Sequence, residues 1–211
     1  AQKRGYAYIA LTDHSQSLKI AGGVSVADLK KKKKEIDGAN RKLKKTRILF
    51  GTEVDIDSGG NLDYPDKVLA GFDIVVAAIH GGFKQPKEKI TARLVKACRH
   101  KHVHIIAHPT GRLWGVRPAY DFDFDKVARA AAETNTVLEI NAYPQRLDLN
   151  DMHARRARAC GARMAVSTDA HLAQQLDNME FGLAVARRAW LGKADVVNCL
   201  PPDKLLKGLK Q

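Results

Sequence analysis

Residues 8–14 read YIALTDH, a short apolar run that ends in a polar triplet. The same arrangement follows in ILFGTEVD (48–55), where an apolar run leads into acidic residues. Apolar runs of about four to eight residues are typical of buried β-strands. Here they alternate with longer stretches of helical pattern, which predicts parallel strands joined by helices. We therefore expect an α/β fold.

Six such runs occur along the chain, and helical patterns fill the intervals. The predicted strands are Tyr8–Leu11, Ile48–Val54, Ile74–Ile79, His104–Ala107, Val137–Ile140 and Met164–Ser167. The predicted helices are roughly Ser25–Lys45, Lys87–Arg99, Asp123–Thr134, Asp151–Cys160, Asp177–Ala189 and Asp203–Lys210. A brief helix is expected after Pro65, because proline favours the first helical turn. We find no linker, repeat or biased tract, so we predict one domain over residues 1–211.

Composition narrows the classes of function. With 45% hydrophobic and 28% charged residues, the chain can bury a sizeable core. No apolar run approaches the roughly 18–20 residues that a membrane span needs, so no membrane is expected as a partner. Cys98, Cys160 and Cys199 include no CxxC pair, which argues against a disulfide framework and a thiolate zinc site. These features favour a cytoplasmic protein.

The charge balance is strongly basic. The net charge is +13, and residues 28–47 alone hold ten Lys and Arg against three Asp and Glu. Such a surface attracts polyanions such as nucleic acid, or phosphorylated small molecules. A solvated helix face is the commoner explanation of a charge run, so both interpretations stay open.

Polar side chains that can bind a metal or carry a proton follow almost every predicted strand. In chain order they are His14, Glu53, Asp55, His80, His108, Glu139, Asn141, Asp169 and His171. The carboxyl ends of parallel strands converge on one face. Carboxylates gathered there would repel one another unless cations offset their charge. Imidazoles and bridging carboxylates suit zinc, manganese or iron, so a polynuclear metal site is predicted.

Each of these residues also has a structural interpretation. A single histidine after a strand is more often a hydrogen-bonded structural residue, and we assign that role to His100, His102, His104 and His153. Asp55 and Asp57 lie in DIDSGGN, where Asp and Asn supply turn chemistry. The metal prediction depends on the set as a whole, because its members share one position on different strands.

The ordered set TDH (12–14), GTEVD (51–55), His80, AHP (107–109) and STDAH (167–171) resembles the polymerase and histidinol phosphatase (PHP) family. The resemblance extends over essentially all 211 residues. Finer features are similar to one branch, the C-terminal PHP domain of bacterial and archaeal family X DNA polymerases. These are AGG (21–23), LDYPD (62–66), EINAYPQRLDL (139–149) and RRAW (187–190).

The resemblance implies a distorted (β/α)7 TIM-like barrel of the PHP type that holds up to three divalent metals (Zn, Mn or Fe). The implied metal ligands are His14, Glu53, His80, His108, Asp169 and His171. In the family pattern Glu53 bridges two metals, one of them also held by His80 and His108. Asp169 binds the other bridged metal, and His14 with His171 serves a third. The same pattern implies catalytic roles for Glu53, His80, Asp169 and His171.

One family motif has no counterpart in the sequence. The HxH of the family's opening strand is missing, which implies a barrel without its first β-α unit. Residues 1–6 also read as the last turn of a helix that stops at Gly5, and the chain has no initiator Met. We therefore expect the C-terminal part of a longer polypeptide, with polymerase domains upstream. That this fragment is inactive without the motif stays an alternative.

The implied chemistry is phosphoester hydrolysis, in which paired metals activate water and clamp the reacting oxygens. We expect action on DNA, as a 3′–5′ exonuclease or end-processing activity in repair. Arg112 and Arg146 are candidates to hold the DNA backbone, and Tyr143 is a candidate stacking surface. Two alternatives stay open. One is a stand-alone phosphatase for a small phosphomonoester such as histidinol phosphate, and the other is a non-catalytic DNA-binding scaffold.

Overall fold

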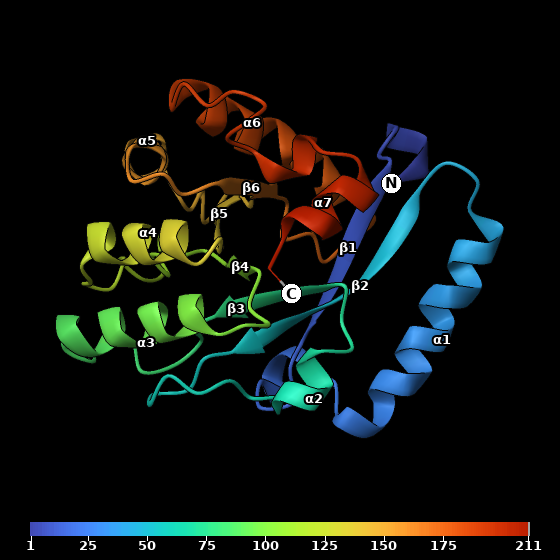
Figure 1. Ribbon diagram of the computed structural model, residues 1–211, viewed down its shortest axis with the longest axis horizontal. Coiled ribbons are helices and arrows are strands. Elements are labelled where there is room, and N and C mark those ends of the chain that lie inside the picture. Colours follow the sequence, from blue (N-terminus) through green and yellow to red (C-terminus); the bar gives the residue numbers. More distant parts are fainter. Residues whose placement is uncertain (211) are drawn as a thin grey trace.

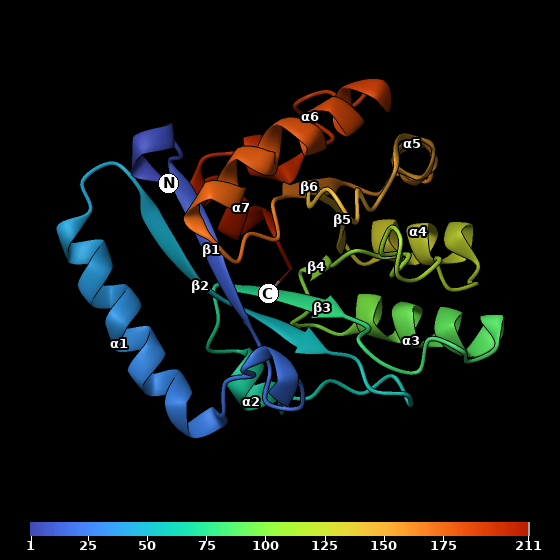
Figure 2. The same cartoon turned by 180° about the vertical axis from the view of Figure 1, so that it is seen from behind.

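A six-stranded parallel sheet organises the computed structural model, which describes residues 1–210. Its strands lie in sequence order from β1 to β6, so each pair is joined by a crossover through a helix or loop. The sheet curls into a half-barrel, with helices α1 to α6 around its convex side (Figures 1 and 2). The strands are β1 Tyr8–His14, β2 Arg47–Asp55, β3 Ile74–Ala78, β4 Ile105–Ile106, β5 Val137–Asn141 and β6 Met164–Ser167. The expected α/β fold is confirmed.

The helices follow the predicted intervals. They are α1 Val26–Lys42, α2 Asp66–Leu69, α3 Lys87–Arg99, α4 Phe124–Glu133, α5 Asp151–Ala159, α6 Met179–Arg188 and α7 Pro202–Gly208. Side-chain caps start three of them, because the oxygens of Ser25, Asp123 and Asn150 accept from the first free backbone N–H groups. The predicted helix at Asp177–Ala189 begins instead as a 3-10 segment, Ala173–Asn178, before α6.

The two faces of the sheet carry separate apolar clusters. On the convex side, residues such as Val54, Val75 and Leu138 pack against the surrounding helices. On the concave side, the early positions of the strands contact Leu205 and Leu209, in and just after α7. The C-terminal helix therefore closes the concave side near the strand starts. At the opposite end of the concave side, where the strands end, the side chains are polar.

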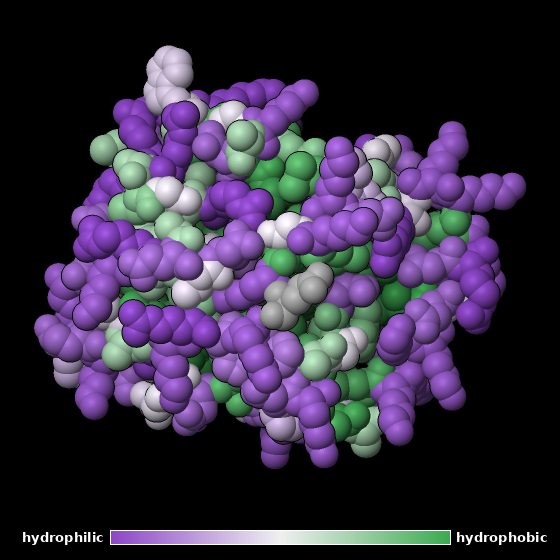
Figure 3. Space-filling view, viewed as in Figure 1, coloured by the Kyte–Doolittle hydropathy of each residue, from purple (hydrophilic) through white to green (hydrophobic). Residues whose placement is uncertain are grey.

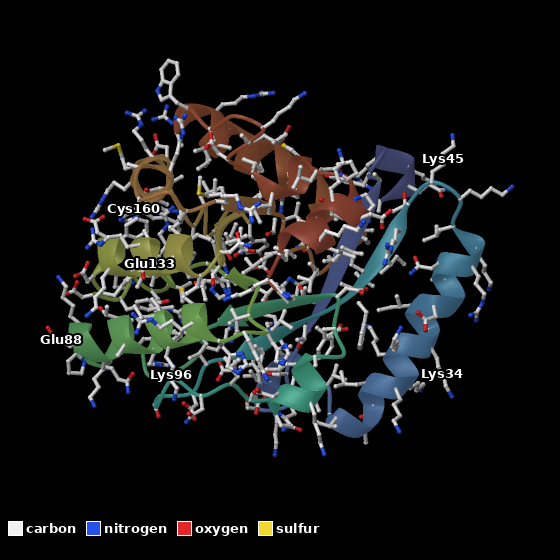
Figure 4. All side chains as sticks on the ribbon, viewed as in Figure 1. Lys34, Lys45, Glu88, Lys96, Glu133 and Cys160 are labelled. Carbon is white, nitrogen blue, oxygen red and sulfur yellow. The ribbon has the colours of Figure 1, made fainter. Side chains whose placement is uncertain are left out.

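Helix α1 carries most of the basic run at one edge of the molecule. Ile36 is its one buried residue, and Lys34 and Lys45 lie at this edge (Figure 4). Hydrophilic side chains dominate the face of the molecule seen in Figure 3. Two ion pairs compensate part of the charge: Lys32 with Asp13 at 3.0 Å and Lys33 with Asp37 at 3.2 Å.

The first residues form a 3-10 turn, Gln2–Arg4, which ends at Gly5 in the left-handed conformation (φ 78°). The sequence predicted a helical turn that stops at this glycine. Within residues 1–210, no helix combines the length and apolar character that crossing a bilayer requires.

Candidate metal centre

Strand periodicity brings the candidate ligands to the concave face. Side chains alternate between the two sides of a strand. In β2 the inward Leu49 is therefore followed on the same side by Glu53, and in β3 the inward Val76 predicts that His80 also points inward. The apolar concave cluster thus gives way to ionisable groups at the carboxyl end of the sheet.

His108 reaches the same place by a break in this alternation. Ala107 belongs to the concave cluster, so a regular strand would turn His108 toward the helices. Its backbone instead has a positive φ of 27°, a region that residues other than glycine seldom adopt. The ring consequently faces Glu53, with Nε2 3.2 Å from Oε1. Such backbone outliers often mark functional positions.

Glu53 is the centre of the cluster. Its Oε1 lies 3.0 Å from Nε2 of His80, 3.2 Å from Nε2 of His108 and 3.9 Å from Nδ1 of His14. The imidazole of His80 is 5.2 Å from that of His14 and 5.4 Å from that of His108, between ring centres. One carboxylate oxygen therefore faces three imidazoles that come from three different strand ends.

The charges in this cluster are strongly coupled. Burial alone would raise the pKa of Glu53, but the contacts with His108 and His80 outweigh it and hold that pKa well below its ordinary value. Burial works against charge on His80 too, yet Asp55 and Glu53 raise its pKa to about 9. The pKa of His14 is lowered, chiefly by burial. The lowered pKa of Glu53 and the raised pKa of His80 thus share one cause, the contact between the two side chains.

This arrangement fits a divalent metal. Ligand atoms of His14, Glu53 and His80 all lie within 4.8 Å of one another. Among residues 1–210, Nδ1 of His14 and Nε2 of His80 are buried without a hydrogen-bond partner, although His80 Nε2 is within 3.0 Å of the Glu53 carboxylate. Ligand atoms that point at one metal ion lie close together without being aligned for a hydrogen bond to each other. Nitrogen and carboxylate donors are the set that zinc and related metals prefer.

Asp169 and His171 lie at the rim of this cluster. Asp169 follows β6 with φ 50°, and its Oδ2 accepts from Arg146 Nε at 3.2 Å and from Asn141 Nδ2 at 3.1 Å. His171 is largely exposed, with its ring centre 6.4 Å from that of His14. The structure therefore gathers four of the six predicted ligands closely and sets the other two beside them. Their roles as ligands stay a prediction.

Two further carboxylates, Asp55 and Asp148, support the cluster from outside. Asp55, which we attributed to turn chemistry, has its Oδ1 3.1 Å from Nδ1 of His80. Asp148 is fully buried and accepts from the backbone N–H groups of Thr110 and Gly111. The i, i+2 spacing of Glu53 and Asp55 places both side chains on one face of the strand, which indicates a role for Asp55 in the cluster. No local sequence pattern indicates such a role for Asp148.

Glu139 is a further buried carboxylate, on β5. It accepts the backbone N–H of His108 at 2.6 Å and is also within 3.2 Å of Nδ2 of Asn141. Burial raises its pKa to about 7, with the nearby charges of Asp169 and Glu53 acting in the same direction. The Glu139 carboxylate therefore holds the backbone turn at His108.

The three predicted substrate contacts differ in their surroundings. Arg112 uses its guanidinium to bind backbone carbonyls of the next loop, those of Arg146 and Leu147. Arg146 lies against Asp169, while Nη1 of its guanidinium is buried without a hydrogen-bond partner among the described residues. Tyr143 is half-buried in the same loop. Contact with a substrate stays a prediction for all three.

The remaining histidines lie apart from the centre. His104 accepts the backbone N–H of Val75 at 2.9 Å, and His153 stacks on Phe124 with ring centres 4.5 Å apart. His100 faces Asp66 at the surface, 3.1 Å away. The contacts of His104 and His100 agree with the hydrogen-bonded roles expected for them, whereas Nδ1 of His153 is buried without a hydrogen-bond partner among the described residues.

The chain is similar to known proteins, although no protein-family model matches it. It is 48% identical over 196 residues to the DNA polymerase/3′-5′ exonuclease PolX of Bacillus subtilis (strain 168), covering 93% of this chain. This chain covers 34% of that relative, about a third of its length. It is also 31% identical over 209 residues to a probable phosphatase of Thermoanaerobacter sp. (strain X514), covering 94% of this chain and 80% of the relative.

A solved structure shares the fold. It is a histidinol phosphate phosphatase from Lactococcus lactis subsp. lactis Il1403, complexed with zinc, L-histidinol and phosphate. The TM-score is 0.60 at 16% sequence identity, over 90% of this chain and 84% of that one. The half-barrel is thus the architecture of a known phosphatase.

Proposed function

The chain belongs to the PHP family of phosphoesterases, and we propose that it hydrolyses DNA phosphodiesters at strand ends with divalent metals held at its concave face. The observation that carries this proposal is the convergence of three histidines on one buried carboxylate, Glu53. Such a donor set binds metals that activate water and neutralise phosphate charge.

The residues of the centre would divide the work. We assign Glu53 to two metals, with His80 and His108 completing one of their sites. Asp169 would bind the second metal, and His14 with His171 would serve a third. Asp55 would orient His80 through Nδ1, which leaves Nε2 directed toward Glu53.

DNA is the substrate that the comparisons favour. The Bacillus subtilis relative is a polymerase and 3′-5′ exonuclease, and it is 48% identical to this chain. The net charge of +13 attracts a polyanion over a small phosphate ester. We infer a 3′–5′ exonuclease or end-processing role, carried out by residues 1–211 beside the polymerase domains of a longer polypeptide.

A second candidate is a phosphatase for a small phosphomonoester such as histidinol phosphate. The 31% identity to a probable phosphatase over most of both chains favours it. A third, a DNA-binding scaffold without catalysis, would keep the barrel and the basic surface.

The test is hydrolysis by protein loaded with Mn²⁺ or Zn²⁺. One substrate is a single-stranded oligonucleotide labelled at its 5′ end, and the other is histidinol phosphate. We expect progressive shortening of the oligonucleotide, abolished in Glu53→Gln and retained in Glu133→Gln, whose side chain is exposed on α4 (Figure 4). Binding should weaken steeply with added salt.

Other results would select the other candidates. Phosphate release from histidinol phosphate with an intact oligonucleotide would favour the second. Salt-sensitive binding of DNA without metal or hydrolysis would favour the scaffold.

A further inference from the structure

Trp114 is an exposed aromatic side chain in the loop that follows β4. The indole is 59% exposed, although the loop begins only six residues earlier, at the candidate ligand His108. The guanidinium carbon of Arg112 lies 5.0 Å from its ring centre. One part of the indole is thus in contact with a cation, and the rest is open to solvent.

The loop that carries Trp114 is held rigidly. The backbone N–H of Trp114 donates to the carbonyl of Gln145 at 2.7 Å. Leu113 and Arg117, on either side of Trp114, form a short antiparallel bridge. Arg112 binds the same neighbouring loop, donating from Nε to the carbonyl of Arg146 at 2.7 Å. The backbone at Trp114 is therefore held against a second loop, so little backbone entropy would be lost on binding a ligand.

The same contacts connect the ring to the metal centre. Arg146, whose carbonyl Arg112 binds, places its own Nε 3.2 Å from Oδ2 of Asp169. Only two arginine side chains therefore separate the indole from a candidate metal ligand.

We propose that Trp114 is a stacking platform for a nucleobase of the single-stranded DNA end whose phosphate lies at the metal centre. The inference rests on the proposed function and narrows it to substrates that carry a base. Stacking on an aromatic ring is tolerant of sequence, because every base has a π-face. The Arg112 guanidinium against the indole would add a cation–π contribution to the stack.

Trp190 provides the contrast. It is even more exposed, at 74%, in the turn after α6. Isolated exposed apolar residues are common, so exposure alone indicates nothing. Among the described residues, Trp190 has no guanidinium over its ring and no contact that leads to the metal ligands.

Intrinsic fluorescence can test the two rings separately, because the chain has only two tryptophans. Trp190→Phe leaves Trp114 as the emitter, and Trp114→Phe leaves Trp190. Each variant is titrated with a short oligothymidylate whose phosphorothioate linkages resist hydrolysis, and with an abasic oligomer of the same length. We expect the oligothymidylate to quench most of the Trp114 emission. The abasic oligomer should not quench it, and neither should change the Trp190 emission.

Fluorescence anisotropy of labelled oligomers supplies the second measurement. Trp114→Ala should weaken oligothymidylate binding about 5- to 160-fold, the range expected for one base–aromatic stack. Trp114→Phe should retain most of the affinity. Oligothymidylate that binds by anisotropy without quenching Trp114 would overturn the inference and leave the proposed function standing. If neither oligomer binds at low salt, the proposed function fails together with the inference.

Discussion

Oδ1 of Asp55 lies 3.1 Å from Nδ1 of His80, and the opposite ring nitrogen, Nε2, lies 3.0 Å from Glu53. The aspartate also accepts the backbone N–H of His80 at 3.1 Å. Asp55 therefore fixes both the ring and the main chain of a candidate ligand. Outer carboxylates of this kind orient a metal-binding imidazole and increase its basicity.

Removing the Asp55 carboxylate should weaken metal binding. We expect Asp55→Asn to lower the affinity for Zn²⁺ or Mn²⁺ about tenfold and Asp55→Ala up to about a hundredfold, because the ring loses its orienting charge. A competition titration with a chelating dye measures the change. Asp66→Asn is the matched control, since Asp66 faces His100 at the same 3.1 Å on the surface. Unchanged affinity in Asp55→Ala would contradict the assigned role.

His104 should make stability depend on pH. Burial is the main cause that lowers its pKa from about 6.5 to about 4, so the folded protein keeps the ring neutral while the unfolded chain takes up a proton. The neutral, buried His104 ring therefore contributes its full share to the free energy of unfolding above pH 6.5. That share is lost as the pH falls toward 4. The loss amounts to about 3 kcal/mol at most.

Urea unfolding of wild type and His104→Asn across this range measures the effect. Asparagine can still accept the N–H of Val75 but cannot titrate. The free energy of unfolding of wild type should fall relative to that of His104→Asn as the pH falls from 7 to about 4. A difference that is constant with pH would rule out the contribution.

Close packing of α6 predicts the effect of a single methyl group. A Cβ on Gly182 would lie 2.5 Å from Cγ1 of Val166 and 2.9 Å from Cβ of Ala142. Gly182→Ala should therefore destabilise the fold by about 1–3 kcal/mol. Gly38→Ala in α1 is the control, because its Cβ would meet only an Arg41 nitrogen, at 3.7 Å.

The control variant should gain about 0.5–1 kcal/mol from helix propensity. Chemical denaturation of both variants measures the two shifts. Shifts of the same sign would show that α6 does not pack against β5 and β6 as described.

The strands and the inward position of most candidate ligands could be predicted from the sequence. Side chains of a strand alternate between its two faces, so the apolar runs show which of the polar residues that follow point inward. Glu53 and His80 reach the concave face by regular alternation. His108 reaches it through a backbone conformation that no local pattern encodes. The packing of Leu205 and Leu209 inside the half-barrel is likewise a tertiary contact between distant segments.

The substrate side was harder to predict. Arg112 was a reasonable candidate for DNA by residue type, but its guanidinium binds two backbone carbonyls of the neighbouring loop. Trp114 belongs to no sequence motif that we identified, so its proposed role depends on the contacts that its loop makes in the structure. Charge and residue type indicate what a side chain can bind, whereas packing decides which side chains are free.

Elemental analysis of purified protein tests the metal centre most directly. Wild type should carry Zn, Mn or Fe. Glu53→Ala should lose nearly all of it, since this carboxylate is assigned to two metals, while His14→Ala should retain part. Glu133→Ala, on the surface of α4, should match wild type. Metal content in Glu53→Ala equal to that of wild type would contradict the account.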